Sequence, residues 1–145
     1  MQTIEQVQED IIEEFSMFDD WMDKYALIIE QGNSLEKLED VYKTPENIIE
    51  GCQSRVWLQT DYKDGKLYFT AESDAVIVKG LLAMVLKVFS GRTPDEINEA
   101  NLHFLQDIGL TEHLSPTRSN GLLAVIKQIK FYAIAYKAKE QQNKN

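Results

Sequence analysis

The chain has a single cysteine among its 145 residues, together with three prolines and two histidines. One cysteine cannot form an internal disulfide or a thiolate-rich zinc or cluster site, so the sequence indicates a protein of a reducing compartment. His103 and His113 do not stand at metal-ligand spacing, so no metal site is expected. The chain also lacks a glycine-rich phosphate loop, a Gly-x-Ser-x-Gly turn and a His-Glu-x-x-His pair, which excludes several common enzyme classes.

Positive charge is scarce in the first third of the chain. Residues 1–50 hold 14 acidic side chains against 3 basic ones, whereas residues 51–145 hold 10 against 12. The formal net charge of −9 would repel a phosphate backbone, which argues against nucleic acid as the main partner. A polarised protein–protein contact and an ordinary solvated acidic face both fit this distribution.

Long apolar runs are absent as well. The most apolar stretch, residues 75–89, is 15 residues long and contains Lys79 and Lys87, so it predicts a buried core helix and no membrane span. The amino end opens into acidic helix sequence and not into a basic region followed by an apolar one, which predicts a cytoplasmic protein without a targeting segment. The length and the 43% apolar content fit one globular domain over residues 1–145.

Helical periodicity marks both ends of the chain. Thr3 and Gln6 form a capping box that begins a helix over residues 3–18, and a second helix over residues 19–31 is expected to end at Gly32. Residues 93–96 begin short helices that reach about residue 108, and Pro116 begins a long last helix. Its expected apolar face consists of Leu122, Ile126, Ile129, Ala133 and Tyr136. Residues 138–145, rich in Lys, Gln and Asn, are expected to form a flexible tail.

Between these helices, the period changes to two over residues 55–72. Asp64-Gly65 lies between two apolar runs, which is a strong signal for a tight hairpin turn. The order of helices, hairpin and helices predicts an α+β fold with a small antiparallel sheet packed against helices. The turn sets the expected strand register, which pairs Tyr62 with Leu67, Thr60 with Phe69 and Leu58 with Ala71.

The cysteine, Cys52, lies outside any apolar periodic run. It follows Gly51 and precedes Gln53 and Ser54, which places it at a loop end before the first strand. A reactive thiol and an inert one are both consistent with this setting. A nucleophilic thiolate needs its pKa lowered from about 8.5 by a cation or by a helix amino end.

Arg55 and Arg118 are the candidate cations for that role. Arg55 is near Cys52 in the sequence, and Arg118 stands at the start of the last helix, where its charge and free backbone N–H groups would combine. Arg118 fits a surface ion pair equally well. Asp74, between the hairpin and the core helix, fits either a helix cap or a partner contact, and Gln53 and Ser54 fit either hydrogen bonding to a bound sulfur or a simple loop end.

At these residues the chain resembles the SufE family of cysteine desulfuration proteins, the sulfur acceptors of iron–sulfur cluster assembly. Three motifs carry the resemblance, which extends from the first helix to about residue 134. They are Gly51-Cys52-Gln53-Ser54 followed by Val56-Trp57; Ser73-Asp74-Ala75 with Ile77-Val78-Lys79-Gly80-Leu81; and His113-Leu114-Ser115-Pro116-Thr117-Arg118-Ser119-Asn120-Gly121-Leu122.

The resemblance implies a fold shared with IscU-type scaffolds. It also implies that Cys52 receives sulfur as a persulfide from a pyridoxal-phosphate-dependent cysteine desulfurase (SufS-like or CsdA-like). The protein would stimulate that enzyme and pass the sulfur to an iron–sulfur scaffold complex. The chain itself would bind no cofactor and would not be an independent enzyme. Gly51, Gln53, Ser54, Asp74 and Arg118 would support Cys52 or contact the partner.

Two other functions stay open at this point. Cys52 could belong to a thiol redox enzyme or sensor that is oxidised to a sulfenic acid, although the sequence supplies no resolving thiol. The shared fold also suggests a cluster or metal scaffold, for which one cysteine and two histidines are too few soft ligands unless the protein dimerises.

Overall fold

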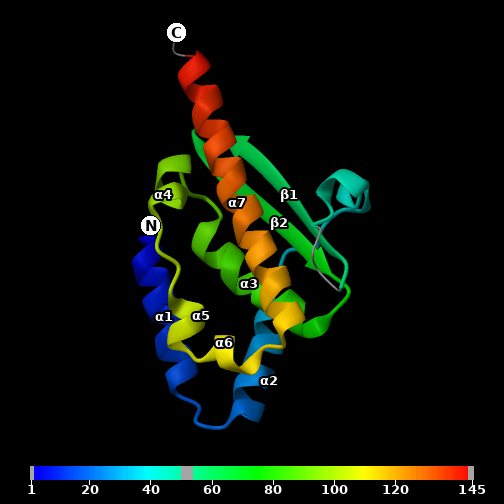
Figure 1. Ribbon diagram of the computed structural model, residues 1–145, viewed down its shortest axis with the longest axis vertical. Helices are drawn as coiled ribbons and strands as arrows, with labels where there is room; N and C mark the ends of the chain where they lie inside the picture. The colour runs from blue at the N-terminus through cyan, green and yellow to red at the C-terminus, as the bar shows by residue number, and fades with distance from the viewer. Residues whose placement is uncertain (1, 50–53, 144–145) are drawn as a thin grey trace.

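Helices pack on one side of a β-hairpin in the computed structural model, which describes residues 2–49 and 54–143 (Figure 1). The α+β class with an antiparallel strand pair, expected from the sequence, is confirmed. Within the described residues the elements are α1 (Ile4–Ser16), α2 (Trp21–Gly32), the 3-10 turns η1 (Asp40–Tyr42) and η2 (Pro45–Asn47), β1 (Val56–Lys63), β2 (Lys66–Ser73), α3 (Val76–Phe89), α4 (Pro94–Glu99), α5 (Phe104–Asp107), α6 (Leu110–His113) and α7 (Pro116–Asn143).

The hairpin has the register that its turn predicts. Asp64 and Gly65 both adopt positive φ, 53° and 80°, as a two-residue hairpin turn of this hand requires. The three predicted pairs are all present, from Tyr62–Leu67 at the turn to Leu58–Ala71 near the open end. The face they form is the buried one, where Leu58, Leu67, Phe69 and Ala71 each expose 5% or less of their surface. Each large aliphatic side chain buried in this way contributes about 1.5–3 kcal/mol to the free energy of unfolding.

The core helix α3 lies between the hairpin and the other helices and contacts β2, α1, α2 and α7. Nine of its residues are buried, as the apolar stretch predicts, so it forms the centre of the hydrophobic core. No helix in the described part of the chain is both long and apolar enough to span a membrane.

A close approach of α2 and α3 explains the glycine at the end of α2. The helix ends at Gly32, as the sequence predicts, but the C-cap is Asn33, with ordinary right-handed backbone angles, and not the glycine. A Cβ atom at Gly32 would come within 3.1 Å of the Gly80 backbone nitrogen, and one at Gly80 would lie 1.9 Å from the Ile28 carbonyl oxygen. The two glycines are therefore needed because the helix backbones nearly touch.

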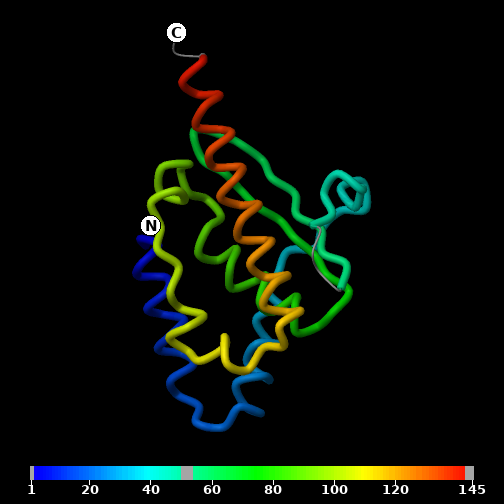
Figure 2. Tube along the Cα trace, viewed as in Figure 1, coloured from blue at the N-terminus to red at the C-terminus, as the bar shows by residue number. Residues whose placement is uncertain are grey.

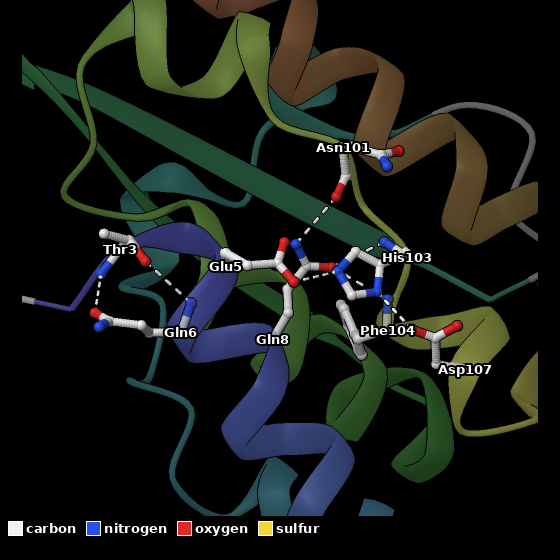
Figure 3. Close-up of polar contacts among 8 residues, drawn as sticks. All are labelled: Thr3, Glu5, Gln6, Gln8, Asn101, His103, Phe104 and Asp107. Carbon is white, nitrogen blue, oxygen red and sulfur yellow. Dashed lines mark hydrogen bonds and ion pairs between the residues drawn. The ribbon is translucent and has the colours of Figure 1, made fainter.

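A polar contact joins α1 to the segment that enters α5 (Figure 3). Gln8 is fully buried, and its side chain donates to the Asn101 carbonyl and accepts from the backbone N–H groups of His103 and Phe104, at 3.0, 2.8 and 3.1 Å. The His103 ring lies between Glu5 and Asp107, at 2.7 and 2.5 Å. We call these residues the α1–α5 clasp: Glu5, Gln8, Asn101, His103, Phe104 and Asp107.

The last helix, α7, packs on α3, α4 and β1, and its last turns extend past the other elements (Figure 2). Its expected apolar face is buried at Leu122, Ile129 and Ala133 and half-buried at the other two positions, and it also includes Val125, which the sequence analysis did not name. The helix continues to Asn143, so residues 138–143 are helical, and the Tyr62 hydroxyl donates a hydrogen bond to Glu140. The flexibility expected of this end stays a prediction.

Candidate functional site

Half of the predicted site can be located. Gly51, Cys52 and Gln53 lie outside the described residues, whereas Ser54, Asp74 and Arg118 lie within them. The structure brings Ser54 and Arg118 together at one cavity, although 64 positions separate them in the sequence. Asp74 is not among the lining residues of that cavity but holds the backbone beside Ser54, as described below.

The cavity has a volume of about 100 Å³ and lies where the beginning of β1 meets α3 and the first turns of α7. Its inner wall is apolar and includes the fully buried side chains of Val56, Leu82 and Val125. Ser54, Thr117 and Arg118 are more exposed and bring polar groups to its rim. The complete lining is Ser54, Val56, Val78, Leu81, Leu82, Thr117, Arg118, Gly121, Leu122 and Val125.

The amino end of α7 points its first turn at this cavity. Pro116 begins the helix, and the Ser115 hydroxyl accepts a hydrogen bond from the Arg118 backbone N–H at 3.3 Å, as a helix-capping side chain does. The prediction that Arg118 stands at a helix start is thus confirmed. Its guanidinium makes no hydrogen bond or ion pair with any described residue, so the surface ion pair considered from the sequence is absent there. The Arg118 charge, which no described residue neutralises, and the positive helix end together favour an anion at the rim.

Asp74 does not cap α3, which was one of its two expected roles. The N-cap of α3 is Ala75, whose backbone N–H is bonded by the Ser73 hydroxyl at 3.2 Å. The Asp74 carboxylate instead accepts a hydrogen bond from the backbone N–H of Arg55, also at 3.2 Å. Asp74 therefore holds the chain just before β1, one residue after Ser54.

The chain is also fixed at the other end of the segment 50–53. The Ile49 backbone N–H donates to the Val56 carbonyl at 2.9 Å, and Ile48 forms an isolated bridge with Trp57. Lys43, ahead of this bridge, forms an ion pair with Glu72 of β2 at 2.6 Å, and its hydrogen bonds to Glu72 and Asp40 raise its pKa above the ordinary lysine value. The residues that flank Gly51, Cys52 and Gln53 are therefore tied to the hairpin on both sides.

A second set of contacts fixes the turn that leads into α7. The Trp21 ring stacks on the His113 ring with a centroid separation of 3.7 Å, and the Tyr25 hydroxyl donates to the His113 carbonyl at 2.8 Å. Both aromatic residues belong to α2, so α2 braces the chain five residues before Arg118. The sequence analysis did not identify this contact, because nothing local in the sequence links residue 21 to residue 113.

The apolar wall of the cavity was also missed as a functional feature. The sequence placed Val78, Leu81 and Leu82 on a core helix, and Val78 and Leu81 in a family motif, but it assigned them no part in a cavity; the available signal was their apolar pattern. Among the described residues, no group of three or more His, Cys, Asp or Glu side chains is placed to hold a metal ion.

Comparison with known proteins agrees with the fold and the motifs. The chain matches the SufE family model, described as an Fe–S metabolism associated domain, over residues 9–133. An uncharacterised SufE-like protein of Rhizobium meliloti (strain 1021) is 46% identical over 125 residues, which cover 83% of this chain and 89% of that protein. One of Rhizobium etli is 42% identical over 125 residues, covering 83% of this chain and 84% of that protein.

A solved structure supports the same fold. The solution structure of a hypothetical protein from Thermus thermophilus superposes with a TM-score of 0.73 at 18% identity, over 89% of this chain and 94% of that one. At this identity the likeness concerns the fold alone. The fold and the family match together define a small α+β protein of iron–sulfur metabolism. The chain belongs to the SufE family.

Proposed function

We propose that this protein is a sulfur acceptor and carrier whose working group is Cys52. In this proposal Cys52 takes sulfur from the persulfide of a pyridoxal-phosphate-dependent cysteine desulfurase, stimulates that enzyme and relays the sulfur to an iron–sulfur scaffold. The protein is then a transfer partner without independent turnover. The observation that carries the proposal is the SufE family match over residues 9–133, which spans the chain's single cysteine.

The transfer itself is a thiol–persulfide exchange. The Cys52 thiolate attacks the terminal sulfur of the desulfurase persulfide, and a new S–S bond forms as the S–S bond on the desulfurase breaks. The desulfurase cysteine leaves as a thiolate and takes up the proton that Cys52 released. No net oxidation or reduction occurs, because one persulfide and one thiol are consumed and one of each is formed.

The cavity rim supplies the electrostatics that such a step needs. Cys52 stands two residues before Ser54 in the sequence, and two residues of extended chain span at most about 7 Å. The Arg118 guanidinium, which has no partner among the described residues, and the positive end of α7 lie at the same cavity as Ser54. A cation near a thiol lowers its pKa, so Arg118 would increase the fraction of Cys52 that is thiolate and would stabilise an anionic persulfide.

The hydrogen bonds on either side of the segment 50–53 support the proposal that this short segment presents the Cys52 sulfur to a partner protein. Ile49 is held by Val56, and Arg55 is held by Asp74, so the segment is attached to the hairpin at both ends. In the proposal, Gly51 allows close backbone approach, and Gln53 and Ser54 are hydrogen-bond donors for the transferred sulfur. The apolar wall of Val78, Leu81 and Leu82 limits the access of water and small thiols.

The presence of a single cysteine supports the proposal that the protein carries a persulfide without releasing its sulfur early. A second cysteine nearby would attack the persulfide, form an internal disulfide and release sulfide. The chain has no second cysteine in its 145 residues, so this route is closed within one molecule. The sulfur then leaves only when an external acceptor thiol reaches it.

The stimulation of a desulfurase tests this proposal. Alanine formed from cysteine by the enzyme is measured alone, with the wild-type chain and with Cys52→Ser. The wild-type chain should raise the rate and Cys52→Ser should leave it at the level of the enzyme alone. Ser34→Ala, a change at an exposed hydroxyl just after α2, is the control and should stimulate fully. Equal stimulation by wild type and Cys52→Ser would overturn the proposal.

A further inference from the structure

The outward face of α7 carries an apolar stripe that no described part of the chain covers. Phe131 and Ile134 expose 59% and 60% of their surface, and Leu123 is also more than half exposed. Their spacing places them on one side of the helix, with Lys127 between Leu123 and Phe131. We call Leu123, Lys127, Phe131 and Ile134 the α7 stripe. It lies on a different side of the helix from Leu122 and Val125, which line the cavity.

The one charged group within this stripe is the ammonium of Lys127. Lys127 is exposed and makes no hydrogen bond or ion pair with any described residue. The neighbouring lysines of α7 differ, because Lys130 donates to the Ala100 carbonyl at 2.9 Å and Lys137 pairs with Asp95 at 3.0 Å. The α7 stripe therefore presents apolar groups around one positive charge and no negative one.

The outward face of α2 has the opposite character. Met22, which exposes 78% of its surface, lines up with Ala26 and the exposed Ile29 at helical spacing. Asp23 and Glu30 lie along one side of this row, without an ion-pair partner among the described residues. We call Met22, Asp23, Ala26, Ile29 and Glu30 the α2 stripe.

The one lysine of α2 does not alter that balance. Lys24 lies over the Trp21 ring, 4.9 Å from its centroid, and is half-buried. The α2 stripe is thus apolar with carboxylates only, whereas the α7 stripe is apolar with an ammonium only. At a rise of about 1.5 Å per residue, Met22 to Ile29 spans about 10 Å and Leu123 to Ile134 spans about 16 Å, so the apolar row of α2 covers about two thirds of the apolar row of α7.

We propose that the α2 stripe of one copy of this chain docks on the α7 stripe of a second copy. Met22 and Ile29 cover Leu123, Phe131 and Ile134, and Lys127 meets Asp23 and Glu30 of the other copy. The same complementarity holds for the whole chain, since residues 1–50 hold 14 acidic side chains against 3 basic ones and residues 51–145 hold 10 against 12. No residue of the α2 stripe or the α7 stripe lines the cavity, so this contact can be tested independently of the sulfur-carrier proposal.

Two helix faces of this length make a small interface, and the net charge of −9 on each copy opposes association. The self-association is therefore weak and depends on salt, because added salt screens the attraction between Lys127 and the carboxylates. Because the contact joins two different surfaces, each pair of copies still has one free α2 stripe and one free α7 stripe. Since the attraction is local and the repulsion is spread over both chains, the charge variants below distinguish this contact from general charge effects.

Sedimentation velocity of the full chain tests the proposal. Up to about 1 mM protein in low salt, the wild type should show concentration-dependent self-association into dimers and larger species, as an association of millimolar strength or tighter requires. Phe131→Ala and Met22→Ala should each weaken it about fivefold or more, because both remove central apolar contacts. A wild type that stays monomeric over this range would overturn the proposal.

Charge variants give the sharper test. Lys127→Glu should weaken dimerisation about threefold or more, whereas Lys139→Glu, which makes the same change in net charge elsewhere on α7, should have much less effect. Adding Glu30→Lys to Lys127→Glu should restore association. A dimer that responds to Phe131→Ala but not to Met22→Ala or Glu30→Lys would show that another surface covers the α7 stripe, and the pairing proposed here would be wrong.

Discussion

The α1–α5 clasp and the cavity rim use polar side chains in opposite ways. In the clasp, both the oxygen and the nitrogen of the Gln8 side-chain amide have partners, and His103 lies between two carboxylates. At the rim, the Arg118 guanidinium has no partner among the described residues and lies beside an apolar cavity. Both regions join segments that are distant in the sequence.

The difference separates stability from function in this fold. A buried amide is tolerated only when it is hydrogen-bonded, so the clasp contributes to the free energy of unfolding. Its polar atoms already have partners within the chain and are not available to bind another molecule. A cation without a partner beside a cavity contributes little to stability and is available to an anion. Substitutions in the two regions should therefore affect different measurements.

The largest effect is expected in the clasp. Gln8→Leu keeps the side-chain volume but leaves the Asn101 carbonyl and the N–H groups of His103 and Phe104 without their partner, which should lower the free energy of unfolding by about 3 kcal/mol or more. Urea unfolding of the wild type and of Gln8→Leu measures this change in the free energy of unfolding. Gln106→Leu, at an exposed glutamine of α5, is the control and should change stability by less than about 0.5 kcal/mol. A similar small change in Gln8→Leu would contradict this account of the clasp.

A smaller effect of a different kind is expected at the rim. Arg118→Ala should leave the free energy of unfolding within about 0.5 kcal/mol of the wild type. It should also raise the pKa of the Cys52 thiol, because in the proposed function Arg118 is the cation that stabilises the thiolate. The pH dependence of alkylation by iodoacetamide, followed by intact mass, measures this pKa. Arg55→Ala is the matched control, since Arg55 does not line the cavity, and should raise it less. An unchanged pKa in Arg118→Ala would remove Arg118 from the proposed site.

The smallest effect is a pH dependence of the clasp. Hydrogen bonds to Asp107 and Glu5 raise the pKa of His103 above its ordinary value of 6.5, so the charged ring stabilises the folded state. This contribution is complete below about pH 6.5 and is lost as the pH rises through the raised pKa of the folded protein. The stability advantage of wild type over His103→Gln should therefore shrink from pH 6 to pH 9, by less than about 1 kcal/mol because the ring is partly exposed.

Urea unfolding at a series of pH values would measure that difference. Asp107→Asn and Glu5→Gln remove the two carboxylates that hold the ring and should flatten the pH dependence. A difference between wild type and His103→Gln that stays constant or grows with pH would show that the charged ring does not stabilise the clasp.

The local parts of the fold could be predicted from the sequence. Asp64-Gly65 sets the strand register because a two-residue turn leaves one pairing, and Thr3 and Thr93 begin helices because their hydroxyls reach backbone N–H groups three residues away. These signals depend on neighbours in the chain. The contact of Gly32 with Gly80 and the hydrogen bonds of Gln8 could not be predicted in this way, since the partners are 48 and about 95 positions away.

The candidate site shows the same division. The motif around Cys52 and the helix start at Arg118 can be identified from the sequence, whereas the joining of Ser54 and Arg118 at one apolar cavity depends on how α3 and α7 pack. Asp74 was placed correctly between the hairpin and the helix, but its hydrogen bond goes to Arg55 and not to α3. The arrangement of Gly51, Cys52 and Gln53 lies outside the described residues and stays a prediction.

The most direct test of the central claim is the intact mass of the protein after incubation with a cysteine desulfurase and cysteine. The account predicts a gain of one sulfur atom, about 32 Da, on the wild type, reversed by reduction and absent in Cys52→Ser, because only a thiol can accept the transferred sulfur as a persulfide. Desulfurase activity is confirmed in the same mixture with another acceptor. A wild type that gains no mass beside an active enzyme, or a Cys52→Ser chain that gains as much, would contradict the account.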